Sequence, residues 1–336
     1  MTAATLAPPP RPAQIVAKPV RVDDAFDNPQ GVLDLIAARA PYTPIYSAEG
    51  YEKAGGTEPW FRYFWYKSGA ELVPEARRFF ENPKFIAASK EAFDAQVVRP
   101  TSFYLNISAP MQAGRPHFDL CRYRGMDETR PFWLQVALHH SLLFMDWTIL
   151  QSTALTWFYR GEGGGYQFWP QGPDKAAQTI ATPLWNTALV TDNDFMFHRA
   201  EAVGPQAQWI APGELKGDVA IHHQADGDWR IDDRAGPRFS FAPKNLRFFV
   251  IWKGLVFKTQ ADADAFDNHT DDLSLDQVWA IFAKDFAERG ERLDIPADPL
   301  TDRTFRERIL TAYPPPGQRY FEEARRADRY QGANAP

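Results

Sequence analysis

The sequence predicts a mixed α and β fold, in which an antiparallel β-sandwich or barrel is flanked by helices on both sides. Two observations predict this fold. Short runs rich in β-branched and aromatic residues, separated by turn signals, crowd the middle of the 336-residue chain. Amphipathic patterns with helical spacing precede and follow that region. Aromatic residues make up 14% of the chain, which favours aromatic-lined strands over a helical bundle.

The N-terminal part is expected to contain a leader and then helices. Residues 1–20 are rich in proline and lack an apolar h-region, which is typical of a flexible leader and not of a signal peptide. Over residues 21–99 the apolar spacing predicts mostly helical structure, with helices near 32–36, 72–80 and 85–98. The aromatic cluster over 60–66 is expected to pack these helices onto the strands that follow.

The predicted β core covers residues 100–258. Turn signals, such as the glycine run over 161–165, separate its short strands. The strands are expected over 101–108, 132–138, 155–159, 166–169, 187–190, 195–199, 219–223 and 246–257, with a helical interruption at 141–152. Residues 259–336 return to a helical pattern, with helices expected over 275–289, 303–312 and 319–329. We therefore predict a single domain spanning residues 21–336.

Composition excludes several classes of protein. The chain has 37 basic and 43 acidic residues and a net charge of −6, so no nucleic-acid partner is expected. No apolar run approaches the roughly 20 residues that a membrane span requires. Cys121 is the single cysteine, which excludes an internal disulfide and a cysteine-rich zinc site. These features predict a cytoplasmic protein that does not insert into a membrane.

The residues that indicate chemistry are His117 and Asp119, in the segment 114–120. Side chains two positions apart in an extended segment share a face, about 6.6 Å apart along the backbone, so both can reach one metal ion. A third ligand must come from elsewhere, and His198 is the best candidate because it lies in the apolar segment 195–199. Two histidines and a carboxylate on one face of an octahedral ion leave three positions open, as in non-haem Fe(II) oxygenases.

Structural interpretations of these residues stay open. A His-x-Asp pair alone is more often structural than metal-binding, and the same spacing over 269–271 lies in a polar run where capping or solvation explains it. The histidine pairs at 139–140 and 222–223 compete as third ligands. Each pair is adjacent on an expected strand, so its two side chains point to opposite faces.

The motif His117-Phe118-Asp119, with His198 far downstream in the segment 192–199, resembles the Fe(II)- and 2-oxoglutarate-dependent dioxygenases. The resemblance covers residues 100–258. It implies a double-stranded β-helix, or jelly roll, flanked by N- and C-terminal helices within a single catalytic domain. It also implies that His117, Asp119 and His198 bind Fe(II), with 2-oxoglutarate as cosubstrate and O2 as oxidant.

In that family an arginine or lysine on a strand after the distal histidine binds the far carboxylate of 2-oxoglutarate. Arg247 lies in the stronger strand pattern, over 246–252, whereas Arg238 matches the Arg-x-Ser pattern of the family more literally. Both lie farther from His198 than is usual, which implies an inserted hairpin near 205–236. A guanidinium in an apolar barrel is costly unless it meets a carboxylate through two parallel hydrogen bonds, which suits this role.

The resemblance implies oxidative decarboxylation of 2-oxoglutarate to succinate and CO2, coupled to hydroxylation of a small organic molecule. Asp119 argues against a halogenase, because halogenating members of the family lack this carboxylate. Two alternatives stay open: a cupin-like metalloenzyme that uses His222 or His223 without 2-oxoglutarate, and a non-enzymatic module that binds a flat ligand. The C-terminal helices offer a surface for a homodimer through three aromatic residues, Tyr320, Phe321 and Tyr330.

Overall fold

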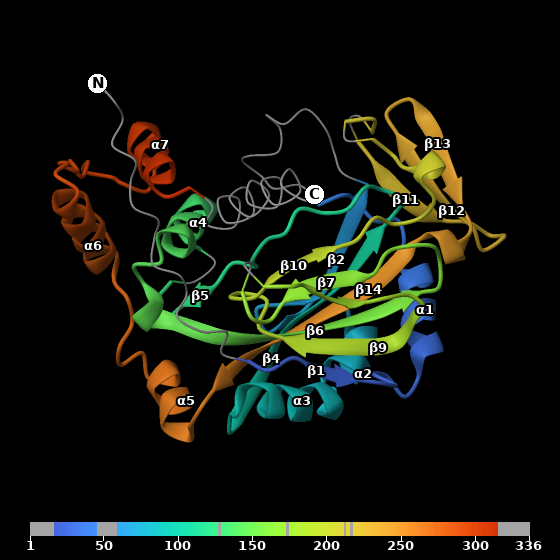
Figure 1. Cartoon of the computed structure of the whole chain (residues 1–336), viewed down its shortest axis with the longest axis horizontal. Coiled ribbons are helices and arrows are strands. Elements are labelled where there is room, and N and C mark those ends of the chain that lie inside the picture. Colours follow the sequence, from blue (N-terminus) through green and yellow to red (C-terminus); the bar gives the residue numbers. More distant parts are fainter. Residues whose placement is uncertain are drawn as a thin grey trace, which may run out of the picture.

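The computed structural model describes residues 17–45, 59–126, 129–172, 175–211, 213–215 and 218–314. Figure 1 shows a large sheet, two smaller sheets and helices packed around them. The leader expected over 1–20 lies almost wholly outside the described residues. The helix expected over 319–329 also lies outside them, with its aromatic residues Tyr320, Phe321 and Tyr330. Among the described helices, none is long and apolar enough to cross a membrane.

The large sheet is antiparallel, with strand order β1-β9-β6-β14-β4-β2-β3 and with β5 beside β6. Strand β14 occupies its centre because it pairs with β4 on one side and with β6 on the other. The eight strands are β1 Val20–Val22, β2 Trp60–Lys67, β3 Ala70–Glu71, β4 Val97–Ser108, β5 Arg122–Tyr123, β6 Thr148–Tyr159, β9 Leu184–Thr191 and β14 Arg247–Phe257.

Two three-stranded sheets complete the β structure. One has the order β10-β7-β8, and the other has the order β11-β12-β13. The second sheet accounts for most of the region where the sequence predicts an inserted hairpin, near 205–236. The strands are β7 Tyr166–Trp169, β8 Gln178–Ile180, β10 Phe197–Ala200, β11 Ala220–His223, β12 Trp229–Asp233 and β13 Gly236–Phe241.

The helices form two groups in Figure 1. Helices α1 to α3 lie along one face of the large sheet, whereas α4, α6 and α7 gather at the end opposite β11 to β13. The helices are α1 Pro29–Ala38, α2 Arg77–Phe80, α3 Pro83–Phe93, α4 Phe132–Ser141, α5 Gln260–Asp267, α6 Leu275–Glu288 and α7 Arg303–Ala312. Short 3₁₀ turns occur at Pro74–Ala76, Met145–Trp147, Gln206–Gln208 and Pro243–Asn245.

Local sequence signals explain several helix ends. Helix α3 begins after Asn82, whose side chain accepts a hydrogen bond from the Lys84 amide at 2.9 Å, and it ends at Asp94 in the left-handed conformation. Helix α6 begins with a capping box between Ser274 and Gln277. These polar caps satisfy amides that a helix terminus otherwise leaves without a partner.

The large sheet separates two apolar clusters because side chains alternate along each strand. On β4, Phe103 and Ile107 face the helices α1 and α3, in a cluster that includes Phe26 and Phe85. Tyr104 faces the opposite way, toward the β10-β7-β8 sheet. We call these two sides the outer face and the inner face of the large sheet.

Four expected elements are wrong. The helix expected over 85–98 ends at Phe93, and strand β4 begins at Val97. Residues 132–138 were expected to form a strand, but they form helix α4, whose apolar side chains pack with α6 and α7. The helical interruption expected at 141–152 ends early, because β6 begins at Thr148. The aromatic cluster over 60–66 forms strand β2, which pairs with β4 and β3, and does not belong to a helical region. Helix α4 is apolar on most sides, so its sequence lacks the periodicity that distinguishes a helix from a buried strand.

Candidate metal centre

The backbone brings His117 and His198 together. Each amide donates to the carbonyl of the other residue, at 3.0 and 3.1 Å, in an isolated antiparallel bridge. Residues paired in this way lie directly opposite each other with their side chains on one face. The bridge adds the segment around His117 to the edge of β10, the strand that carries His198. The two imidazole centroids are 4.4 Å apart.

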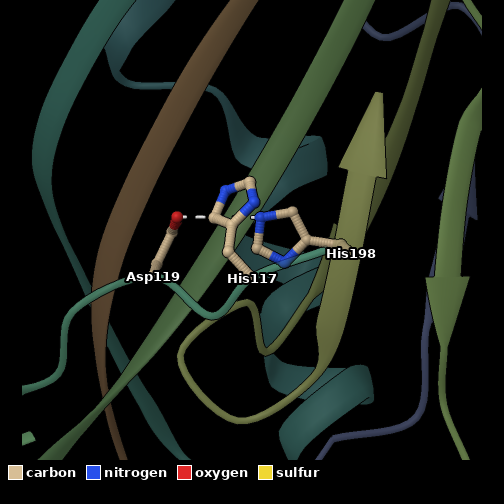
Figure 2. Close-up of side chains that lie close together, drawn as sticks. All are labelled: His117, Asp119 and His198. Carbon is tan, nitrogen blue, oxygen red and sulfur yellow. Dashed lines mark ion pairs between the residues drawn. The ribbon is translucent and has the colours of Figure 1, made fainter. Parts of the chain in front are cut away.

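Asp119 completes the group two residues after His117. Its amide donates to the carbonyl of Asn193 at 2.9 Å, which holds the loop before β10 against this segment. The Asp119 carboxylate lies 3.7 Å from Nε2 of His198. One ligand atom from each of the three side chains lies within 4.8 Å of the others. Figure 2 shows the carboxylate and the two rings pointing toward one another.

A backbone carbonyl close to Nδ1 orients each of the two imidazole rings. Nδ1 of His117 lies 2.9 Å from the carbonyl of Arg115, and Nδ1 of His198 lies 3.0 Å from the carbonyl of Met196. A carbonyl accepts only from a protonated nitrogen, so each contact places the proton of a neutral ring on Nδ1. Nε2 of each ring then carries the lone pair that can bind a metal ion, as in metal-bound histidines. Nε2 of His198 also lies 3.4 Å from Nδ2 of Asn193.

Burial and charge prepare the ligands for a cation. Burial and the neighbouring His117 lower the pKa of His198 to about 4, so its ring is neutral near pH 7. Burial favours a higher pKa for Asp119, but the Lys253 ammonium and the two imidazoles hold its pKa below the usual range. The carboxylate therefore stays ionised, and metal binding has few protons to displace at these two side chains.

Lys253, on β14, is a part of the site that the sequence analysis missed. Its Nζ donates to Oδ2 of Asp119 at 2.7 Å and lies 3.8 Å from Oδ1 of Asp194. Burial favours a lower pKa for this lysine, but Asp119 raises its pKa above the usual range. The strand period contains a usable signal, because Lys253 is an even number of residues from Arg247 on the same strand. The two side chains must therefore share the inner face.

A second carboxylate, that of Asp194, lies near Asp119. Burial raises the pKa of Asp194 to about 6, and Lys253 opposes that rise. Its Oδ2 accepts a hydrogen bond from Nε2 of Gln151 at 2.9 Å. Lys253 therefore lies between two carboxylates and holds both of them near the inner face.

The two candidate arginines lie in different environments. Arg247 is 1% exposed at the start of β14, where its Nε donates to the carbonyl of Gly164 at 2.6 Å. Its guanidinium lies 4.5 Å from the ring of Phe249, and its Nη2 is buried without a hydrogen-bond partner. Arg238 lies on β13 and donates to Asp233 at 2.5 Å. Arg247 thus has a buried Nη2 that can still donate a hydrogen bond, whereas Arg238 is already paired with the Asp233 carboxylate.

We call His117, Asp119 and His198 the metal group. No other histidine of the described residues belongs to it. His139 lies on helix α4, and its Nδ1 is 3.1 Å from Sγ of Cys121. His222 lies on β11 with Nε2 3.6 Å from Asp232, and His223 contacts the ring of Trp229. The second His-x-Asp motif, over 269–271, is a surface turn in which His269 pairs with Asp272 at 2.8 Å.

The inner face also holds aromatic and polar side chains that the sequence analysis did not assign to a site. Trp60, Arg62 and Phe64 lie on β2 and are only partly buried. The indole nitrogens of Trp60 and Trp157 and the amide nitrogen of Asn106 are buried without a partner. Because these residues share the face that carries Lys253 and Arg247, the surroundings of the metal group are rich in unused hydrogen-bond donors.

No family model matches the chain. No curated protein matches it either. Solved structures similar to it include an oxidoreductase of the 2OG-Fe(II) oxygenase family from Burkholderia pseudomallei, with 12% identity, a TM-score of 0.39, and coverage of 71% of this chain and 86% of that chain.

A prolyl-4-hydroxylase from Pseudomonas putida is 9% identical, with a TM-score of 0.39 and coverage of 72% of this chain and 94% of that chain. HygX from Streptomyces hygroscopicus, solved with nickel, 2-oxoglutarate and hygromycin B bound, is 10% identical, with a TM-score of 0.37 and coverage of 71% and 83%. The family that the sequence resembles thus recurs among these structures.

Proposed function

We propose that this protein is a non-haem Fe(II)- and 2-oxoglutarate-dependent oxygenase that hydroxylates an unactivated C–H bond of a small organic molecule. The observation that carries the proposal is the convergence of His117, Asp119 and His198, whose ligand atoms lie within 4.8 Å of one another. Two imidazoles and one carboxylate are the donor set that binds one face of a ferrous ion and leaves the other positions open.

The surroundings of Arg247 suit the cosubstrate. A fully buried guanidinium without a carboxylate partner is costly, and burial lowers the pKa of Arg247 to about 10. A dicarboxylic keto acid removes this cost, because its far carboxylate accepts hydrogen bonds from the free Nη2. We therefore assign Arg247, and not Arg238, as the residue that binds 2-oxoglutarate.

Each residue of the site has a separate task. Lys253 occupies Oδ2 of Asp119, which leaves Oδ1, the oxygen nearer His198, to bind the metal ion. The ring of Phe118 stacks on Phe197 at a centroid distance of 3.8 Å on the opposite side of the segment, and this contact helps to exclude water. When bound, the ferrous ion and 2-oxoglutarate supply the oxidation of a C–H bond by O2, with release of succinate and CO2.

The proposal extends to the architecture. We assign the large sheet and the β10-β7-β8 sheet as the two sheets of a jelly roll, because the metal group lies where β10 faces the inner side of β14. Residues 21–336 then form a single catalytic domain, in which the helices of both ends support this core.

The first experiment tests the metal ligands. Anaerobic addition of Fe(II) and 2-oxoglutarate should produce the weak visible charge-transfer band of the iron chelate, and addition of O2 should release succinate. Asp119→Ala should lose both signals. Asp271→Ala is the matched control, because Asp271 ends the second His-x-Asp motif and pairs with Arg124 at the surface. Full activity of Asp119→Ala would contradict the assignment of its carboxylate as a ligand.

The second experiment tests the arginine. Arg247→Met should raise the concentration of 2-oxoglutarate needed for the charge-transfer band by about 100-fold, since a charge-assisted bidentate contact is lost. Arg238→Met should leave that concentration unchanged. The reverse result would transfer the role to Arg238. Binding of the metal without the band in the wild-type protein would favour a cupin-like enzyme, and no effect of metal removal on ligand binding would favour a binding module.

A further inference from the structure

Arg62 is a cation on the inner face that the proposed reaction does not use. It lies on β2, the next-to-last strand of the large sheet, and is only partly buried. Its Nε donates to Oδ1 of Asn106 at 2.9 Å, and its guanidinium stacks 4.8 Å from the centre of the Tyr104 ring. No carboxylate of the described residues forms an ion pair with it. The two terminal nitrogens of the guanidinium thus have no assigned anion.

Asn106 supplies a second, independent observation. Its side chain is 0% exposed, and its Nδ2 is buried without a hydrogen-bond partner. The hydrogen bond from Arg62 occupies Oδ1, so the amide is held in the orientation that presents Nδ2 as a donor. A buried donor without a partner costs free energy, and in a binding site a ligand acceptor removes that cost.

These two residues share the inner face of the sheet with Lys253, which contacts Asp119. The register aligns Arg62 of β2 with Asn106 of β4, and Asn106 with Phe249 of β14. The Phe249 ring lies 6.1 Å from Trp60 and 4.5 Å from the guanidinium of Arg247. The apolar cluster around it continues to Tyr166, whose ring is 5.8 Å from His198. A continuous cluster of aromatic rings thus runs from Trp60, two residues from Arg62 on β2, to His198.

Tyr104, on β4, provides a second line of contacts from Arg62 toward the charged residues of the inner face. Its ring contacts Phe64 at 4.8 Å and the guanidinium of Arg62 at the same distance. Burial raises the pKa of its phenol, and the charges that act on that phenol include Arg62, Lys253 and Asp119. Tyr104 pairs with Ile251 of β14, and Lys253, which contacts Asp119, lies two residues further along the same face, so Tyr104 lies between Arg62 and the metal group.

We infer that Arg62 and Asn106 bind a carboxylate of the substrate, which is a carboxylic acid with a flat apolar body. This inference rests on the proposed function, because it names the substrate class of the same site. The two terminal guanidinium nitrogens form a fork that matches a planar carboxylate, and Asn106 Nδ2 is a third donor. The partly buried rings of Trp60 and Phe64 supply faces on which an apolar body packs.

Arg62 and Arg247 are suited to different anions. Arg247 is 1% exposed and is enclosed by Gly164 and Phe249, so it suits a cosubstrate of constant shape. Arg62 is on a strand near the edge of the sheet and is partly exposed, so larger molecules can approach it. A substrate carboxylate on Arg62 would place the rest of the molecule along the aromatic surface toward His198.

The experiment compares acids with their neutral amides. Binding of trans-cinnamate, phenylacetate and indole-3-acetate, each beside its primary amide, is measured by calorimetry with the full chain. The measurement is made with and without Fe(II) and 2-oxoglutarate under anaerobic conditions. At least one acid should bind about 10- to 100-fold more tightly than its amide, which is the range for charge-assisted hydrogen bonds. Equal affinities for every acid and amide would overturn the inference.

Variants then assign the preference to Arg62. Arg62→Met should abolish the preference for the acid, and Arg62→Lys should restore only part of it, because lysine lacks the planar fork. Arg160→Met is the matched control, since Arg160 stacks on Trp185 at 3.9 Å but makes no contact with Asn106. An unchanged preference in Arg62→Met would overturn the inference.

The charge-transfer band separates this inference from the proposed function. Arg62→Met should keep the band of the Fe(II) and 2-oxoglutarate chelate at wild-type intensity, which also shows that the variant is folded. If the band is lost while metal binding persists, Arg62 binds the cosubstrate and the inference is wrong. If the wild-type protein prefers the acid but shows no band, the substrate inference stands and the proposed oxygenase function fails.

Discussion

The two faces of the large sheet are built from the same strands and differ in almost every physical property. Along β14, Phe248, Val250 and Trp252 point to the outer face, where they pack with the helices α1 and α3. The alternate residues Arg247 and Lys253 point to the inner face and carry charge. One strand thus contributes to a dry core on one side and to an ion-binding surface on the other.

Both faces contain buried polar atoms without a partner, but those on the outer face, at Trp65 and Thr156, are neutral, whereas the inner face also leaves a charged guanidinium nitrogen unpaired. Nε1 of Trp252 donates to the carbonyl of Phe80 at 2.9 Å on the outer face. On the inner face, Asn106 Nδ2 and Arg247 Nη2 are buried without partners. Unmet donors lower stability, so they persist in a fold where they serve a ligand. The comparison indicates that apolar packing on the outer face stabilises the fold, and that this packing offsets the cost of the unpaired charged donor on the inner face.

Trp252→Ala should show the largest loss of stability, because it removes a fully buried indole from the outer face. Truncation of such a core residue costs about 3–5 kcal/mol. Urea denaturation should shift to a lower midpoint, while the folded fraction still binds Fe(II) with wild-type affinity. A reduced metal affinity in the folded variant would break the division between the two faces.

Lys253→Met replaces the residue that follows Trp252 on β14 and tests whether the inner face determines metal affinity. Removing the ammonium leaves the Asp119 and Asp194 carboxylates without their cation, which should cost about 3 kcal/mol in the metal-free protein. Metal affinity should fall by about 10- to 100-fold, as for other residues that orient a ligand. Isothermal titration with Fe(II) under anaerobic conditions measures this loss, and Trp252→Ala serves as the comparison. An unaffected metal affinity would refute the positioning role of Lys253.

The smallest effect concerns pH and Asp194. Burial raises the pKa of this carboxyl to about 6, whereas its value in the unfolded chain is about 3.8. The folded protein therefore holds this proton at pH values where the unfolded chain has lost it, and the resulting stability is lost as the pH rises through 6. Between pH 5 and 7 the loss should be about 1 kcal/mol in the metal-free protein. Urea midpoints of the wild type and Asp194→Asn measure it, and equal pH slopes would contradict the raised pKa.

Sequence reasoning was most successful where a pattern was local. The β-branched and aromatic runs over 101–108 and 246–257 predicted most of β4 and all of β14, and the helical spacing over 275–289 and 303–312 predicted α6 and α7. It failed for α4 and β2, because an apolar run such as 132–138 fits a buried helix as well as a buried strand. The error at β2 also concealed Arg62, which gains its meaning only from its neighbour Asn106.

The sequence by itself determined the chemical types at the candidate site: a His-x-Asp pair in an extended segment, a downstream histidine in an apolar run, and an arginine on a strong strand. Those features depend on residue identity and on the two-residue period of a strand, which are local properties. Only the tertiary structure decided that His198 lies opposite His117, that Arg247 keeps an unpaired donor while Arg238 pairs with Asp233, and that Lys253 meets Asp119. These contacts join residues far apart in the chain, and their partners are selected by sheet register and burial, which no local pattern encodes.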